Sequence, residues 1–223
     1  MEKKKMLLIC SGGLDSVAWG LMKSRTDDVS LMVFDYGQKA AQKEMDVVAM
    51  FSLRHQLGMM KIDISGHNHI FGNTQLTSHD IEIEIAFAPS VIVPLRNALF
   101  LQFAMCFAYS HDYDAIGLGF HADDSVNNKF PDSSRRFLDF FETTMRHGVP
   151  KGAKYVSTST PAQAGLRKKD ILRSAADIDR EMLWLSWSCY TGGKRQCGVC
   201  VACRNRKAAF QDAGVEDKTE YEG

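Results

Sequence analysis

The chain has 223 residues, of which 45% are hydrophobic and 24% are charged, a composition typical of one globular domain with a small appendage. Its 27 basic and 27 acidic residues give a formal net charge of zero. This balance argues against nucleic-acid binding as the main task, because phosphate contacts need an excess of Lys and Arg. Only five apolar residues follow the basic residues 3–5, too few for a signal peptide. We therefore expect a cytoplasmic protein that has no membrane partner.

Strand-like and helix-like segments alternate along the chain. This alternation predicts an α/β fold with a parallel sheet covered by helices on both faces, whose ligands bind at the carboxyl ends of the strands. We expect the main domain to span residues 1–185, a zinc-binding region of helix and loop with four cysteines to span 186–214, and an acidic tail at 215–223 to fray. Strands are predicted at residues 6–10, 29–34, 61–64 and 115–119, a polar loop at 65–90, and helices at 17–24, 40–57, 95–110, 135–147 and 168–180.

The segment after the first predicted strand is typical of a phosphate-binding turn. Its glycine pair lets the backbone approach an anion, and the first N–H groups of the next helix point at that anion. Serine hydroxyls add donors, while the aspartate suits a magnesium ion or orients a nucleotide. No Gly-Lys-Ser/Thr follows, so the turn is not of the Walker type; the alternative is a Ser/Gly turn that caps a helix. The segment is Ser11, Gly12, Gly13, Leu14, Asp15 and Ser16.

Four cysteines gather near the end of the chain, and two of their spacings are Cys-x-x-Cys. Four thiolates suit a closed tetrahedral zinc site, which leaves no open position for chemistry. An iron–sulfur cluster and free or redox-active thiols remain alternatives, although the ferredoxin pattern needs a cysteine where Lys207 stands. The remaining two, Cys10 and Cys106, are expected to be core thiols. The clustered cysteines are Cys189, Cys197, Cys200 and Cys203.

Other polar residues give weaker signals. His121 follows the strand predicted at 115–119, which places it where ligands bind in such folds. His67 and His69 form a His-x-His pair that could bind a metal, although we expect them to be surface histidines. Basic residues near the cysteines are expected to be a solvated surface: Lys194, Arg195, Arg204, Arg206 and Lys207.

Several motifs occur in a fixed order. They are the loop of residues 11–16, Asp35-Tyr36-Gly37-Gln38, Val93-Pro94-Leu95-Arg96-Asn97, Pro131-Asp132, Trp187-Ser188-Cys189-Tyr190 and the cysteine block with Arg206, Ala209 and Phe210. In this combination nearly the whole chain resembles the 7-cyano-7-deazaguanine synthase (QueC) family. The loop itself resembles the SGGxDS loop of the wider ATP pyrophosphatase superfamily. The resemblance implies a Rossmann-like sheet of the adenine nucleotide alpha hydrolase type.

The resemblance also implies a reaction. ATP adenylates the carboxylate of 7-carboxy-7-deazaguanine, ammonia displaces AMP to give an amide, and a second ATP activates the amide so that a nitrile forms. ATP, Mg²⁺ and Zn²⁺ are the implied cofactors, and a homodimer is the implied assembly. The implied catalytic residues are Asp15, Arg96 and Lys168; ATP binding falls to Ser11, Gly12, Gly13, Leu14, Asp15, Ser16, Tyr36 and Gln38, and substrate binding to Asn97, Asp132 and Phe137. Alternatively, Arg96 and Lys168 are surface charges and Asp132 is a helix N-cap.

One segment departs from the family pattern. Family members read Pro-Asp-Cys-Arg-Pro-Glu-Phe where this chain has Pro131-Asp132-Ser133-Ser134-Arg135-Arg136-Phe137. This leaves open a second function, in which the activated deazaguanine is joined to an amine of a partner protein, such as its N-terminus, as in QueC-like proteins of anti-phage defence operons. A third possible function is that of a tRNA thiolase-like protein with the same ATP loop. The zero net charge and the closed cysteine pattern disfavour this third function.

Overall fold

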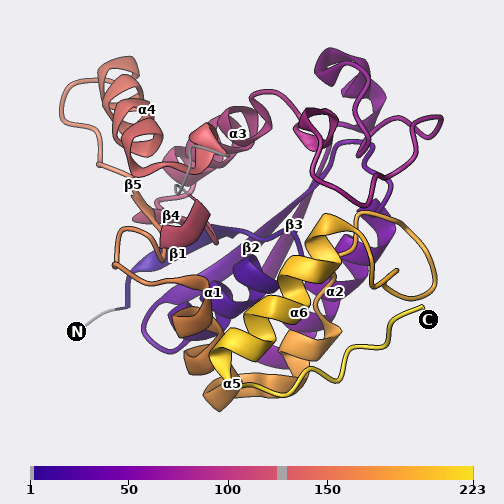
Figure 1. Cartoon of the computed structure of the whole chain (residues 1–223). Helices are drawn as coiled ribbons and strands as arrows, with labels where there is room; N and C mark the ends of the chain where they lie inside the picture. Colours follow the sequence, from indigo (N-terminus) through magenta and orange to yellow (C-terminus); the bar gives the residue numbers. More distant parts are fainter. Residues whose placement is uncertain (1–2, 125–129, 223) are drawn as a thin grey trace.

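A parallel five-stranded sheet forms the centre of the molecule, in the order β3-β2-β1-β4-β5 (Figure 1). The computed structural model describes residues 3–124 and 130–222. This sheet confirms the α/β, Rossmann-like fold expected from the sequence. Its strands are β1 (Lys5–Ile9), β2 (Asp28–Asp35), β3 (Gly58–Asp63), β4 (Ala115–Gly117) and β5 (Ser157–Ser159).

The two central strands are apolar on both sides. Along β1, Leu8 packs in one hydrophobic layer and Leu7 packs in the layer on the opposite face. Along β2, Leu31 packs in the same layer as Leu8, and Met32 packs in the same layer as Leu7. Leu8 and Leu31 are also neighbours in the pairing of β1 with β2. Strands that are buried on both faces need continuous apolar runs instead of alternating ones, which is why these segments were recognisable in the sequence.

Helices cover both faces of the sheet, as predicted (Figure 1). One layer contains α1, α2, α5 and α6, and the other contains α3 and α4. Short 3₁₀ helices lie in the connections. The bounds are α1 (Leu14–Ser24), α2 (Ala41–His55), α3 (Arg96–Ser110), α4 (Arg135–Gly148), α5 (Lys168–Leu185), α6 (Val201–Ala213), η1 (Ser65–Phe71), η2 (Pro89–Val91) and η4 (Pro131–Ser133).

The strand order places a topological switch beside the turn that follows β1. The chain moves from β1 to β2 and β3 on one side, then returns through α3 to β4 on the other side of β1. Gly119, just after β4, lies so close to the turn that a Cβ there would be 2.7 Å from the Ser16 nitrogen. Crevices at such switch points are where doubly wound sheets bind ligands.

One strand was not predicted, and one helix was expected only as part of a helical or loop region at 186–214. The short edge strand β5 has the sequence Ser-Thr-Ser, which carries no apolar pattern. Helix α6 begins inside the cysteine cluster, where the metal-ligand spacing obscured its buried positions Val201, Ala209 and Phe210. The expected loop at 65–90 also contains η1.

The acidic tail was predicted to fray, but residues 215–222 pack against the body. The indole nitrogen of Trp184 donates to the Glu216 carbonyl at 2.7 Å. Near the end of the tail, the Glu222 N–H donates to the Gln196 carbonyl at 2.8 Å. The prediction failed because the tail's acidity indicated solvent, whereas its backbone is bound by partners that are distant in the sequence.

The stretch Pro89–Ser110 is long and apolar enough to cross a membrane, by length and composition only. In the fold, α3 packs on the sheet through buried Leu101 and Met105. A core helix of a soluble protein passes the same test. The predicted core thiol Cys106 lies on the exposed side of this helix, so that prediction was wrong, while Cys10 is fully buried as expected.

Candidate active site and cysteine cluster

A cavity of about 670 Å³ lies at the carboxyl ends of β1, β2 and β4. This volume is within the range of small-molecule sites. Predicted site residues from distant parts of the chain line it together, along with residues that the sequence did not single out. The lining includes Ser11, Gly13, Leu14, Asp15, Ser16, Tyr36, Gln38, Glu44, Arg96, Asn97, His121, Asp123, Asp124, Asp132, Ser133, Lys168, Trp187, Ser188 and Tyr190.

The turn after β1 has the geometry of an anion cradle. Gly13 is the N-cap of α1 and makes no side-chain cap bond, so the first N–H groups of the helix remain available to an anion. The Ser16 hydroxyl donates to the Gly13 carbonyl at 3.0 Å, and the Gly13 N–H donates to the Ser11 hydroxyl at 3.3 Å. These contacts hold the turn in one shape.

Gly12 allows the turn to pack closely against α2. Its φ is +70°, and a Cβ there would lie 2.6 Å from the Glu44 carbonyl oxygen. The residue must therefore be glycine for the turn to pack against α2. Gly12 is absent from the cavity lining. It therefore contributes to the site through the backbone conformation of the turn and not through direct contact with a ligand.

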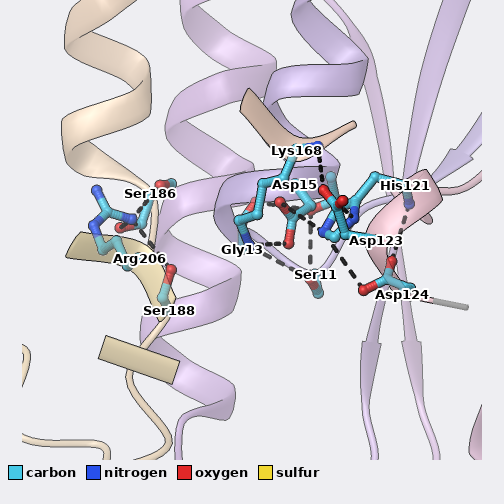
Figure 2. A network of polar contacts seen from close by, with 11 residues as sticks. Ser11, Gly13, Asp15, His121, Asp123, Asp124, Lys168, Ser186, Ser188 and Arg206 are labelled. Carbon is cyan, nitrogen blue, oxygen red and sulfur yellow. Dashed lines mark hydrogen bonds and ion pairs between the residues drawn. The ribbon is translucent and has the colours of Figure 1, made fainter. Parts of the chain in front are cut away.

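Lys168 lies at the start of α5, and its side chain lines the cavity. Its Nζ donates to the Asp15 Oδ2 atom at 2.8 Å, although 153 residues separate the two (Figure 2). The other carboxylate oxygen, Asp15 Oδ1, is buried and has no hydrogen-bond partner among the described residues. The surface-charge alternative for Lys168 therefore does not describe its position.

His121 lies beside this pair, surrounded by carboxylates (Figure 2). Its Nε2 is 3.8 Å from Asp15 and 3.4 Å from Asp124, and its Nδ1 is 3.7 Å from Asp123. Burial is the main reason that the pKa of Asp124 is raised, and the negative charge of Asp15 raises it further. His121 and Lys168 act in the opposite direction.

Gln38 and Tyr36 follow β2, as predicted, but the Gln38 amide is used within the protein. Its oxygen accepts from the Tyr36 N–H at 2.9 Å, and its nitrogen donates to the Phe34 carbonyl and to the Glu44 carboxylate. The amide thus fixes the loop that presents the Tyr36 ring to the cavity. The Tyr36 hydroxyl accepts from Arg96 at 2.9 Å.

Glu44 is a cavity residue that sequence reasoning missed. Burial raises the pKa of this carboxyl to about 7, and the nearby Asp35 charge adds to the rise, while the Gln38 hydrogen bond and the Arg96 charge oppose it. The residue lies in the first turn of α2, where an acidic side chain is ordinary. For that reason the local sequence gave no sign that it faces a cavity.

Arg96, Asn97 and Asp132 lie together beside Tyr36 in the cavity. Burial is the main cause that raises the pKa of Asp132, while the Arg96 charge and hydrogen bonds with Asn97 lower it. Arg96 Nε is buried without a hydrogen-bond partner in the described part of the chain. The N-cap alternative for Asp132 was wrong, because Ser134 caps α4 by accepting from the Phe137 N–H at 3.2 Å.

Phe137 is the predicted substrate-binding residue that the structure places away from the cavity. Its ring packs with the hydrophobic layer formed by α3 and α4. A ring of this kind in the first turn of an amphipathic helix is a core residue, so we do not include it in the site.

The four clustered cysteines can hold a metal ion. Their sulfur atoms all lie within 4.8 Å of one another, and only Cys197 is partly exposed. The Cys200 N–H donates to the Cys197 sulfur at 3.3 Å, which supports negative charge on that sulfur. Four thiolates this close together repel one another, so they coexist here only around a cation.

The cysteine region is packed directly onto the cavity. The Trp187 N–H donates to the Gly12 carbonyl at 2.9 Å, which joins the segment before the cluster to the anion-binding turn. Tyr190, which also lines the cavity, follows Cys189. A bound metal would therefore fix one wall of the site through the backbone, without taking part in the chemistry.

Arg206 was expected in a solvated basic surface, but it is only 1% exposed. Its guanidinium donates to the Leu183 carbonyl at 2.7 Å. It also donates to the Ser186 hydroxyl at 2.7 Å (Figure 2). Thr219 in the tail accepts another of its bonds at 2.8 Å. The residue ties α6 to the end of α5 and to the tail, which explains why it belongs to the cysteine block.

A sequence profile described as "Queuosine biosynthesis protein QueC" matches residues 5–214. Proteins named 7-cyano-7-deazaguanine synthase are similar over nearly the whole chain. The one from Methanosphaera stadtmanae is 31% identical, and the alignment covers 99% of this chain and 99% of that protein. The one from Sinorhizobium fredii is 34% identical, and the alignment covers 98% of this chain and 92% of that protein.

Among solved structures, the U34-tRNA thiolase NcsA from Methanococcus maripaludis, with its [4Fe-4S] cluster, has a TM-score of 0.53 at 14% identity. The match covers 94% of this chain and 64% of the thiolase, and it concerns the fold alone. The chain belongs to the QueC family.

Proposed function

We propose that the protein is an ATP-dependent carbon–nitrogen ligase that acts on 7-carboxy-7-deazaguanine. The substrate carboxylate attacks the α-phosphorus of ATP, which releases pyrophosphate and leaves an acyl adenylate. Ammonia then attacks the acyl carbon, and AMP leaves as the amide forms. A second ATP adenylates the amide oxygen, and loss of AMP and a proton leaves 7-cyano-7-deazaguanine. The names of the full-length relatives support this reaction.

One observation carries the proposal. Within the described ranges, three buried side-chain polar atoms lack a hydrogen-bond partner: Asp15 Oδ1, Arg96 Nε and His121 Nδ1. All three residues line the same cavity. Buried polar groups are normally paired, so this concentration indicates a site completed by a polar ligand.

The phosphate end of ATP would lie at the turn after β1. Negative charge develops on the departing pyrophosphate, and donors fixed in advance stabilise it best. The free N–H groups of α1, the Ser11 and Ser16 hydroxyls and the Lys168 ammonium supply such donors. Asp15, with its unpaired oxygen, would hold the magnesium ion that neutralises part of the phosphate charge.

The deazaguanine would lie toward α3 and η4. Asp132 can accept from N–H donors on the guanine-like edge, and Arg96 has a buried free donor that suits a carboxylate. Tyr36 and Tyr190 add aromatic surface to the same cavity. In this arrangement Asn97 positions Asp132 through their hydrogen bonds.

The acceptor amine is the part of the proposal with an alternative. Within the segment that departs from the family pattern, Ser133 lines the cavity, and Arg135 and Arg136 lie exposed on α4. A hydroxyl stands there where the family pattern has a thiol, so this part of the cavity lining departs from the family chemistry. An amine of a partner protein is therefore the second candidate acceptor.

We propose zinc as the metal at Cys189, Cys197, Cys200 and Cys203. The four sulfur atoms form a closed donor set, which suits structural zinc. Elemental analysis of the purified protein should give about one zinc per chain. Stoichiometric iron with visible sulfur-to-iron absorption would instead identify an iron–sulfur cluster.

The ATP site is tested by removing single groups from the turn. Asp15→Ala and Ser16→Ala should each abolish AMP formation from ATP and 7-carboxy-7-deazaguanine while the fold is retained. Ser24→Ala on the same helix is the matched control, because the Ser24 hydroxyl only bonds the Leu21 carbonyl. Wild-type AMP production by Asp15→Ala or Ser16→Ala would reject the assignment.

Mass spectrometry identifies the acceptor. With ammonium, ATP and 7-carboxy-7-deazaguanine, the products of the proposed reaction are the amide and then the nitrile. If the acceptor is a protein amine, the nitrile will be slow or absent and a partner chain will gain the mass of the deazaguanine acyl group. No AMP release with the carboxylate under either condition would reject both.

A further inference from the structure

Glu44 is a carboxyl of the cavity that the steps proposed above do not use. Its Oε2 accepts from the Gln38 side-chain nitrogen at 2.8 Å. Its Oε1 accepts no hydrogen bond from the described residues and is not sealed off, so it is open to the cavity that the residue lines. One oxygen therefore fixes the side chain, and the other is available to a bound molecule.

The position of Glu44 places this oxygen between the two ends proposed for the substrates. The Glu44 carbonyl adjoins the anion-binding turn, since a Cβ on Gly12 would lie 2.6 Å from it. On the other side, the Gln38 amide that holds the carboxyl also accepts from the Tyr36 N–H, and the Tyr36 hydroxyl accepts from Arg96. The phosphates are proposed at the turn and the substrate carboxylate at Arg96. The acyl phosphate bond would therefore form in the part of the cavity that Glu44 lines.

A carboxylate in this place suits one reactant of the proposed reaction. The ATP phosphates and the substrate carboxylate are anions, which a further carboxylate repels. The nitrogen of ammonia instead becomes positively charged as it bonds to the acyl carbon, and it must lose a proton to leave a neutral amide. Arg96 is a permanent cation that cannot take this proton, and Lys168 is engaged as an ammonium with Asp15.

We propose that Glu44 is the general base of amide formation and accepts a proton from ammonia as the nitrogen attacks the acyl adenylate. A C–N bond forms and the C–O bond to AMP breaks, and the electron pair of the broken bond leaves with the AMP phosphate. One N–H bond breaks, and its proton passes to Glu44 Oε1 and later to water. The inference rests on the adenylation step of the proposed function and assigns a residue to the step that follows it.

The charges around Glu44 suit this role. Burial raises the pKa of its carboxyl to about 7, while the Arg96 charge lowers the pKa and the Asp35 charge raises it. Burial also raises the pKa values of Cys10 and Tyr36, which interact with the Glu44 charge, so both groups are neutral near pH 7. A base is most effective when its pKa is close to the working pH, because it is then largely charged and still holds the proton that it accepts.

The test separates adenylation from amide formation. Exchange of labelled pyrophosphate into ATP, with 7-carboxy-7-deazaguanine and no amine, measures adenylation. Ammonium is then added to the preformed acyl adenylate, and mass spectrometry of the amide and nitrile measures the second step. Glu44→Gln keeps an acceptor for Gln38 and removes the base. Amide formation should fall at least about 10²-fold in this variant, whereas pyrophosphate exchange should change by less than about threefold.

Glu84→Gln is the matched control. Glu84 also accepts from a glutamine side chain, that of Gln75 at 2.8 Å, but it does not line the cavity. The substitution removes the same charge from a similar hydrogen bond. It should change neither the exchange rate nor the rate of amide formation.

Two further measurements distinguish a base from a group that only shapes the site. The rate of amide formation, divided by the ammonia concentration, should fall about tenfold per pH unit below about pH 7 in the wild type and stay level in Glu44→Gln. Hydroxylamine is a less basic amine that loses its proton more readily, so it depends less on a protein base. It should convert the acyl adenylate of Glu44→Gln to the hydroxamate at a rate within about tenfold of the wild type.

Equal losses of exchange and amide formation in Glu44→Gln, unchanged amide formation in that variant, or the same pH dependence in both proteins would overturn the proposal. A hydroxylamine reaction as slow as the reaction with ammonia would also count against a base. Exchange without any amide in the wild type would overturn the role of Glu44 and leave adenylation standing. No exchange in the wild type would reject the adenylation step itself, and with it the proposed function.

Discussion

Lys168 and Arg206 interact with opposite ends of α5, and their surroundings differ in kind. Arg206 is almost fully buried and donates to carbonyl oxygens of Leu183 and Ser186 at the end of the helix, where a cation is favoured by the helix dipole. Lys168 begins the helix, where a cation is disfavoured, and its ammonium is 2.8 Å from a carboxylate in the cavity.

The completeness of each network separates structure from function. Arg206 has acceptors on α5 and in the tail, so its arrangement is finished when the chain folds. Among the described residues, the Lys168 network includes Asp15, which keeps an oxygen without a partner, and His121, which keeps a nitrogen without one. The first network therefore holds the fold together, and the second has the open positions that the proposed function assigns to a ligand.

Among the structural residues, the largest effect is expected from a change in the cluster of four cysteines, which lies next to Arg206. Cys200→Ser should remove the bound metal and destabilise the region after α5, because binding of a structural metal contributes on the order of 10 kcal/mol to local folding. Metal content and the melting temperature give the readout. Cys106→Ser, an exposed thiol outside the cluster, is the control and should change neither. A Cys200→Ser protein with full metal content and an unchanged melting temperature would refute the structural role.

Removal of the buried guanidinium is expected to have the next largest effect. Arg206→Met would leave several buried carbonyl oxygens without donors, at a cost of about 3–5 kcal/mol in the free energy of unfolding. Urea unfolding measures the change. Arg195→Met is the surface control, since its partner Glu220 is 76% exposed, and it should cost less than about 0.5 kcal/mol. Similar losses in the two variants would mean that the buried network has no special weight.

The opposite pattern is expected for Lys168. Lys168→Met should lower the rate of AMP formation by about 10²–10³, since one donor to a developing charge is lost. The free energy of unfolding should change by less than about 1 kcal/mol. Lys154→Met, whose side chain pairs with Asp114 away from the cavity, controls for loss of a lysine. A loss of stability as large as that in Arg206→Met would place Lys168 in the structural class.

The smallest effect concerns the pH dependence of stability. The pKa of Glu44 is raised from 4.5 to about 7 in the folded protein. Its contribution to stability is therefore complete below pH 4.5 and is lost as the pH rises through 7, because the folded state retains the proton longer than the unfolded chain. Relative to wild type, Glu44→Gln should gain about 2–3 kcal/mol between pH 5 and 8. Parallel stability curves for the two proteins would show that the carboxyl has an ordinary pKa.

The sequence by itself determined the features that depend on neighbouring residues. The anion-binding turn needs only a buried strand, two glycines and a helix start, all within residues 5–16. The metal cluster depends mainly on the Cys-x-x-Cys spacing of residues 197–203, and the central strands depend on runs of apolar residues. In each case the local backbone geometry and the residue types fix the structure, so the signal survives without knowledge of the fold.

Only the tertiary structure decided which charges meet. Lys168 reaches Asp15 across 153 positions because α5 packs against α1. Glu44 and Asp124 look like ordinary surface acids in the sequence, and their place in the cavity follows from the approach of α2 and of the segment after β4 to the turn. Arg206 is buried for the same kind of reason. Burial and partner choice are properties of packed elements, and the local sequence does not encode which distant element a side chain will face.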